Sequence, residues 1–184
     1  MAREMSLEER LEDSRIVMLY GPVTSEVASR AICRLLQLSA EDDKADIHIY
    51  FGTTYGSALN ILAIYDTISA IPNDVTGTCM GHVMGYTTLL LACCTKGKRY
   101  ALKHAIVSLD QTTGVLSPGS NQQTEIEIAA REATKGRAVF EELMAKATSQ
   151  DLSKVHSDCE VGNEFSAKEA LEYGIIDKIL ERGE

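Results

Sequence analysis

The sequence predicts an α/β fold: one domain with a mainly parallel sheet and crossover helices. Short apolar, β-branched runs alternate along the chain with longer segments of helical periodicity. Strands that alternate with helices in this way favour a parallel sheet with right-handed crossovers. The 184 residues contain no internal repeat, low-complexity tract or interdomain linker, so we expect a single domain over residues 1–184.

The N-terminal half is predicted to contain repeated strand–helix units. Residues 15–20 (RIVMLY) form an apolar run that ends at Gly21-Pro22, as a buried strand before a turn does. Thr24 or Ser25 then caps a helix. The following elements are a strand over 47–51, a loop over 52–57, a helix over 59–71, a strand over 75–80, a turn over 81–85, a helix over 86–94 and a strand over 105–109.

The C-terminal third is dominated by one long predicted helix. Residues 111–122 are rich in turn formers, and a helical pattern then runs over 124–148, long enough to pack against more than its own domain. Ser166-Ala167-Lys168-Glu169 is a capping box, which predicts a helix over 166–171. A last strand is expected over 175–180.

Charge and hydropathy argue against several classes of function. Eighteen basic and 27 acidic side chains give a formal net charge of −9 without a long basic run, so we expect no binding to nucleic acid or anionic membranes. No run of 18 apolar residues could cross a bilayer, and the first residues lack the core of a signal peptide. The five cysteines include no CxxC pair, which favours reduced, buried thiols.

Several segments together resemble the proteolytic subunit of the Clp protease, ClpP. The resemblance runs from about residue 7 to residue 180. It rests on AIYDT at 63–67, CMGH at 79–82, KGKRYAL at 96–102, TEIEI at 124–128, and SAKEA with EYG within 166–174. It implies the ClpP/crotonase-like fold, an N-terminal segment and first helix over 1–14, a handle region over 111–148, and heptameric or tetradecameric rings.

The positions of the family's catalytic triad differ in this chain. The resemblance places Gly85 at the nucleophilic serine, Asp110 at the general-base histidine, and Gly162, or a residue next to it, at the orienting aspartate. Acyl transfer needs a hydroxyl that an imidazole activates and a carboxylate orients. We therefore expect the chain not to be an enzyme, but a non-catalytic subunit of the type called ClpR.

The loop that forms the oxyanion hole in the family is altered as well. The resemblance assigns Tyr55, Gly56 and Tyr86 to it, and Tyr55 replaces one of two glycines whose backbone approaches the substrate. A tyrosine side chain there is expected to crowd the substrate strand.

Other reactive side chains near these positions have plainer interpretations. We expect Thr88, Cys93 and Cys94 to pack in the helix interface, whereas Thr87 lies two residues beyond the nucleophile position. His82 and His104 are expected in loops or on the surface. His48 and His156 have no partner at metal-ligand spacing, and no phosphate-binding loop is present, so we expect neither a metal nor a cofactor.

The resemblance also implies partners. The subunit would share homomeric or mixed rings with active ClpP paralogues and bind an AAA+ unfoldase of the Clp family. The pocket for an apolar loop of the unfoldase is expected at His48, Tyr50, Thr78, Met80, Tyr100, Leu102 and Leu180. The implied compartment is the bacterial cytoplasm, or an organelle such as the plastid stroma after removal of a transit peptide.

Two other functions stay open at this point. One is an active serine-type endopeptidase subunit of the Clp protease, which would need a working triad. The other is an acyl-CoA hydratase or isomerase with the same fold, for which the chain is short.

Overall fold

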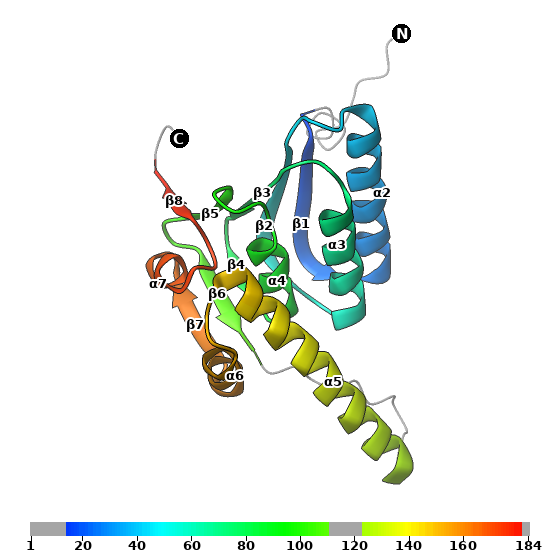
Figure 1. Ribbon diagram of the computed structural model, residues 1–184. Coiled ribbons are helices and arrows are strands. Elements are labelled where there is room, and N and C mark those ends of the chain that lie inside the picture. Colours follow the sequence, from blue (N-terminus) through cyan, green and yellow to red (C-terminus); the bar gives the residue numbers. More distant parts are fainter. Residues whose placement is uncertain (1–13, 111–122, 182–184) are drawn as a thin grey trace.

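A curled, mostly parallel sheet forms the centre of the molecule in the computed structural model, which describes residues 14–110 and 123–181 (Figure 1). The strands are β1 (Ile16–Val23), β2 (Ile47–Gly56), β3 (Val75–Cys79), β4 (His82–Met84), β5 (Arg99–Leu102), β6 (Ile106–Leu109), β7 (Asn163–Ser166) and β8 (Lys178–Leu180). Their order is β7-β6-β4-β2-β3-β5-β8, with β1 paired to β2 beside this path. β7 runs antiparallel to β6, and the other pairs are parallel, which confirms the predicted fold class.

The sheet branches at β2. The first half of β2 pairs with β3, where Phe51 lies opposite Cys79, and its second half pairs with β4. The chain passes from β3 to β4 at Met80 and Gly81, and the Met80 amide donates to the Phe51 carbonyl at 2.7 Å. A Cβ at Gly81 would lie 3.1 Å from the Thr53 nitrogen, so the close approach favours glycine. β5 and β8 extend one branch, and β6 and β7 extend the other.

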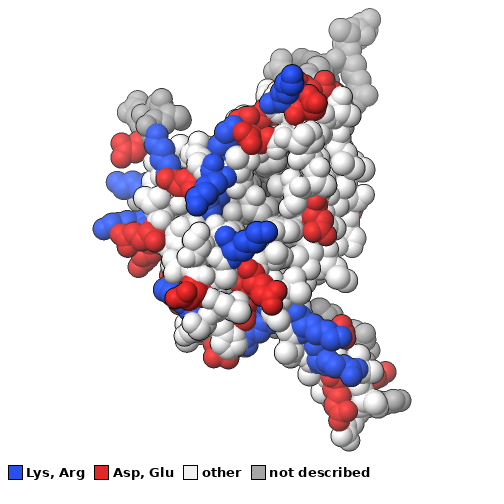
Figure 2. All heavy atoms as spheres, in the orientation of Figure 1, with Lys and Arg blue, Asp and Glu red and all other residues white. Residues whose placement is uncertain are grey.

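Six described helices surround this sheet. They are α2 (Ser25–Glu41), α3 (Ala58–Ala70), α4 (Tyr86–Ala92), α5 (Gln123–Thr148), α6 (Leu152–Val161) and α7 (Ala167–Tyr173). Figure 1 shows α5 projecting from the body of the molecule, with its N-terminal end farthest out. Figure 2 shows acidic and basic side chains interspersed along this projecting helix.

The predicted helix starts agree with the structure. The Thr24 side chain accepts a hydrogen bond from the Val27 amide and caps α2. Ser166 and Glu169 form the predicted capping box at the start of α7. α5 begins one residue before the predicted start and ends at the predicted residue, Thr148.

Three predicted loops or turns are instead strand. β1 continues through Gly21 and Pro22 because it pairs in parallel with Thr54 and Tyr55 of β2. β2 therefore covers nearly all of the predicted loop over 52–57, and β4 lies within the predicted turn over 81–85. Backbone pairing with a neighbouring strand outweighs the local turn signal at these positions.

Several elements have no counterpart in the sequence predictions. β5, α6 and β7 are short, and the last strand is limited to β8. The first helix predicted within residues 1–14 and the turn-rich segment 111–122 lie outside the described residues, apart from Ser14. Among the described helices, none is long and apolar enough to span a bilayer.

Candidate functional site

Gly85 occupies a sharp turn between β4 and α4. It is the residue before the first turn of α4, and its φ of 54° and ψ of −126° favour glycine strongly. Its amide donates to the Ser108 carbonyl at 3.2 Å, which joins the turn to β6. The strand–turn–helix predicted for the nucleophile position is thus present in the backbone.

Asp110 lies between Gly85 and Gly162, the two glycines that the resemblance places at the other triad positions. A Cβ built on Gly85 would stand 3.7 Å from Oδ2 of Asp110, and one built on Gly162 would stand 3.8 Å from Oδ1. Gly162 caps α6 in the left-handed conformation, with a φ of 67°. The structure therefore brings Gly85, Asp110 and Gly162 together, and we refer to them as the three-residue site.

A short polar chain leads away from Asp110. The Ser108 hydroxyl donates to Oδ2 of Asp110 at 3.0 Å, and Nε2 of His82 lies 3.3 Å from the same hydroxyl. Because the Ser108 proton points to Asp110, the hydrogen bond from His82 requires the tautomer with a proton on Nε2. The sequence predictions assigned no role to Ser108 and placed His82 in a loop or on the surface, but His82 begins β4 and is half-buried.

The hydroxyl groups closest to Gly85 in the chain are buried. The Thr87 hydroxyl lies 2.9 Å from the Thr54 carbonyl oxygen and 2.6 Å from the Met84 carbonyl oxygen, and Thr88 donates to the Ser108 carbonyl at 2.8 Å. Ser108 itself is only 1% exposed. Thr87 and Thr88 thus hold α4 against the sheet, in line with the packing predicted for Thr88.

The predicted oxyanion loop lies at the end of β2 and the start of α4. Tyr55 is half exposed, whereas Gly56 is enclosed, because a Cβ there would lie 2.8 Å from Cβ of Val23. Tyr86 is buried, and its ring meets the Phe140 ring edge-on with centroids 4.8 Å apart. Tyr86 therefore points into the α4–α5 contact.

The cysteines near α4 are buried thiols. Burial raises the pKa of Cys94 to about 12 and that of Cys79 to about 11, and the pKa of Cys93 also lies well above its ordinary value because of burial. Thiolate is the nucleophilic and metal-binding form, so these groups stay unreactive near neutral pH. Cys94 packs in the core and Cys93 packs against it, as predicted, whereas Cys33 is exposed.

The remaining histidines lie apart from the three-residue site. His104 is exposed, as predicted, and His48 is half-buried on β2. His156 lies on α6 with Nδ1 3.0 Å from Oε2 of Glu141. Among the described residues, no three His, Cys, Asp or Glu side chains are placed to hold a metal ion.

The residues predicted to bind an unfoldase lie on one face of neighbouring strands. Tyr50 pairs with Thr78, Thr78 pairs with Tyr100, and Leu102 pairs with Leu180 in parallel register. His48 lies two residues from Tyr50, so both point to the same side of β2, and Met80 directly follows the end of β3. Met80 and Leu102 are the most exposed, and Thr78 is buried between its neighbours. We call this surface the outer sheet face.

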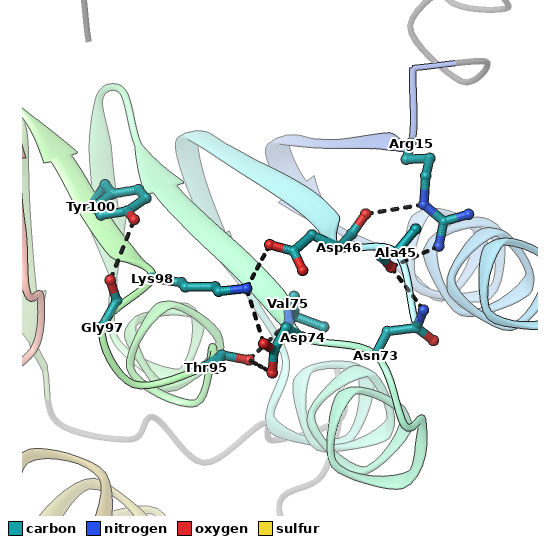
Figure 3. A network of polar contacts seen from close by, with 10 residues as sticks. All are labelled: Arg15, Ala45, Asp46, Asn73, Asp74, Val75, Thr95, Gly97, Lys98 and Tyr100. Carbon is teal, nitrogen blue, oxygen red and sulfur yellow. Dashed lines mark hydrogen bonds and ion pairs between the residues drawn. The ribbon is translucent and has the colours of Figure 1, made fainter. Parts of the chain in front are cut away.

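A polar network fixes the opposite ends of these strands (Figure 3). Lys98 binds Asp46 at 2.6 Å and Asp74 at 2.9 Å, and these hydrogen bonds raise the pKa of Lys98. Arg15 donates to the carbonyls of Asp46 and Ala45. The network joins the starts of β1, β2, β3 and β5, so it holds the sheet together at a distance from Gly85.

Comparison with known proteins identifies the family. A model of the Clp protease family matches residues 1–183. The chain belongs to the Clp protease family. It is 39% identical over 178 residues to the "ATP-dependent Clp protease proteolytic subunit" of Streptococcus pneumoniae (strain Hungary19A-6). The aligned region covers 97% of this chain and 90% of that protein.

This match corrects one prediction. The expectation that the chain is not an enzyme rested on side chains at three positions, and it is wrong: the matched relative of this Clp family member is a proteolytic subunit, and the match spans almost the whole chain. Gly85 itself holds a strained backbone conformation at the turn before α4, with a φ of 54° and a ψ of −126°. The acyl-CoA alternative has no support from the family match.

Proposed function

We propose that this chain is a proteolytic subunit of an ATP-dependent Clp protease and works in a ring of such subunits. The observation that carries the proposal is the whole-length family match combined with the turn at Gly85, which faces Asp110. The S. pneumoniae relative is named as a proteolytic subunit of the same protease.

The residue that would act as the nucleophile has to be identified by experiment. A serine-type mechanism uses a hydroxyl nucleophile, and Gly85 carries none while Ser108, Thr87 and Thr88 are buried. Asp110 supplies a carboxylate beside the turn. The acylated residue therefore has to be located directly, both in this chain and in the subunits that share its ring.

The test is peptide hydrolysis by purified rings, followed by mass spectrometry of a covalent fluorophosphonate adduct. Rings of this chain alone and rings formed with a second Clp proteolytic subunit are compared. We expect peptide hydrolysis to elute with the rings on gel filtration. We also expect mass spectrometry to find the adduct on a single residue. A folded chain that forms no ring and hydrolyses no peptide in either preparation would overturn the proposal.

We also propose that the outer sheet face binds a Clp unfoldase. Aromatic and aliphatic side chains at Tyr50, Tyr100 and Leu102 provide the apolar contact area on which a short peptide loop can anchor. His48 and Thr78 make the surface more polar, which favours weaker docking than an all-apolar pocket would give. Titration of an unfoldase against assembled rings tests this proposal.

A further inference from the structure

Among the described residues of α5, those that are buried all lie in the C-terminal half of the helix. No residue between Gln123 and Val139 is buried, whereas Phe140, Glu141, Met144 and Thr148 are. The helix meets the body of the molecule at Gly136, Arg137, Phe140 and Glu141, which we call the α5 base. Figure 1 shows this helix running from the projecting end toward α4, with α6 near its path.

One side of the α5 base contacts α4 through Tyr86. The ring of Tyr86 packs against Phe140 with an interplanar angle of 62°. A Cβ on Gly136 would lie 3.1 Å from the Tyr86 hydroxyl, closer than ordinary van der Waals contact, so glycine leaves the room that the tyrosine uses. Tyr86 directly follows Gly85, so its contact with Phe140 joins the α5 base to the turn at Gly85.

The other side of the α5 base contacts α6 through charged groups. Arg137 binds Glu141 at 2.6 Å on its own helix and Glu160 of α6 at 3.3 Å. His156 of α6 lies 3.0 Å from Glu141 and 3.6 Å from Glu160. Gly162 caps the C-terminal end of α6, so this cluster fixes the helix whose cap faces Asp110.

The cluster is anchored by a buried carboxylate. Burial alone would raise the pKa of Glu141, but hydrogen bonds from Arg137 and His156 outweigh it and hold that pKa below its ordinary value. Glu141 is 6% exposed, so removal of its partners would leave a buried charge uncompensated. The contact between Glu141 of α5 and His156 of α6 therefore resists small displacements of the two helices relative to each other.

We propose that the α5 base is a positioning element that sets the distance between Gly85 and Gly162 on either side of Asp110. It holds Gly85 through Tyr86 and α4, and it holds Gly162 through Arg137, Glu141 and α6. This inference rests on the proposed function, because it concerns the same site. Its test measures hydrogen exchange and does not depend on peptide hydrolysis. Gly136, Arg137 and Glu141 are positioning residues and do not touch the three-residue site themselves.

Hydrogen exchange measured on the full chain tests the α6 side. Arg137→Gln is expected to speed exchange about tenfold in the segment that contains Gly162, while β3 keeps its wild-type rate. Arg137→Lys, which retains the positive charge, is expected to restore part of the protection. The matched control is Lys135→Gln, which removes an exposed ion pair with Glu132 on the same helix and should change neither segment.

The α4 side is tested by steric rescue. Gly136→Ala is expected to speed exchange in the segment around Gly85, whose amide bonds to the Ser108 carbonyl. Tyr86→Phe combined with Gly136→Ala removes the hydroxyl that the new methyl group meets and should return exchange to the rate of Tyr86→Phe alone. A uniform increase that includes β3, or unchanged exchange at both glycines in Arg137→Gln and Gly136→Ala, would overturn the proposal.

Discussion

Arg99 and Asp177, which are 78 residues apart in the sequence, form a bidentate ion pair. Nε of Arg99 donates to Oδ2 of Asp177 at 2.8 Å, and Nη2 donates to Oδ1 at 2.5 Å. Arg99 also donates to the Ala147 carbonyl near the end of α5. The pair thereby joins β5, the segment before β8 and the C-terminal end of α5.

The first prediction concerns the strength of this pair. Arg99→Ala should lower the free energy of unfolding by about 3–5 kcal/mol, because it removes the guanidinium that pairs with the largely buried Asp177 carboxylate and leaves that carboxylate only the amides of residues 97 and 99. Urea denaturation measures the loss. Lys135→Ala, which removes an exposed ion pair, should cost no more than about 1 kcal/mol. Similar losses in the two variants would contradict the assignment of Arg99 as a buried anchor.

The second prediction is a loss of stability in acid. Burial acts to raise the pKa of Asp177, but hydrogen bonds and charge from Arg99 outweigh it, so the folded pKa lies below the ordinary value. A depressed pKa contributes stability above the unfolded value, about pH 4 for aspartate, and that contribution is lost as the pH falls through the folded pKa.

The measurement for this second prediction is a series of urea denaturations from pH 7 down to pH 3. The wild type should exceed Asp177→Asn in stability at pH 7, and the difference should shrink as the pH falls below about 4. Glu132→Gln serves as the exposed control, with a difference that stays small at every pH. A difference between wild type and Asp177→Asn that does not depend on pH would contradict the prediction.

A third prediction follows from the backbone at Gly85. Gly85→Ala places a side chain at a φ of 54° and a ψ of −126° and should cost about 1–3 kcal/mol. The space itself is open, since the nearest described atoms to a Cβ there belong to Asp110 at 3.7 Å and beyond. Gly162→Ala is the comparison: it enters the left-handed helical region and should cost about 1–2 kcal/mol. Unchanged stability of Gly85→Ala would show that the turn relaxes freely.

Much of the fold was predictable because strands and helices alternate with clear apolar patterns. The parallel sheet, the long α5 and the capping box at Ser166 all follow from local sequence. The sequence predicts that β2 ends at residue 51, because Gly52 and Gly56 resemble turn residues. Pairing with β1 and β4 instead keeps the strand extended to Gly56. α6 lacks a strong apolar stripe, and the Glu141–His156 contact that holds it spans 15 residues.

The candidate site was only partly predictable. The resemblance identified three positions that the structure brings together, and the two-residue spacing of Ser108, in β6, and Asp110, directly after β6, could have indicated their contact. His82 lies 26 residues from Ser108, so their contact depends on the pairing of β4 with β6. The inference from Gly85 and Asp110 to a chain without enzymatic function is wrong, because the relative that matches 97% of this chain is a proteolytic subunit.

The fourth prediction concerns the outer sheet face. Leu102→Ala should weaken unfoldase binding about 30-fold if Leu102 is an anchor of the docked loop, since truncation of an anchor residue typically costs 2 kcal/mol or more. Tyr50→Ala should act in the same direction. Val161→Ala, at an exposed apolar residue of α6, is the control and should leave affinity unchanged. Fluorescence anisotropy of a labelled unfoldase loop peptide on assembled rings measures each affinity.

ATP-dependent degradation of a tagged, folded protein by rings that contain this chain tests the proposed function most directly. Rings are assembled with and without a second Clp proteolytic subunit and supplied with a Clp unfoldase and ATP. The proposal predicts degradation that requires ATP and that decreases when this chain carries Leu102→Ala. Degradation by neither ring, from a chain that is folded and assembled, would contradict it.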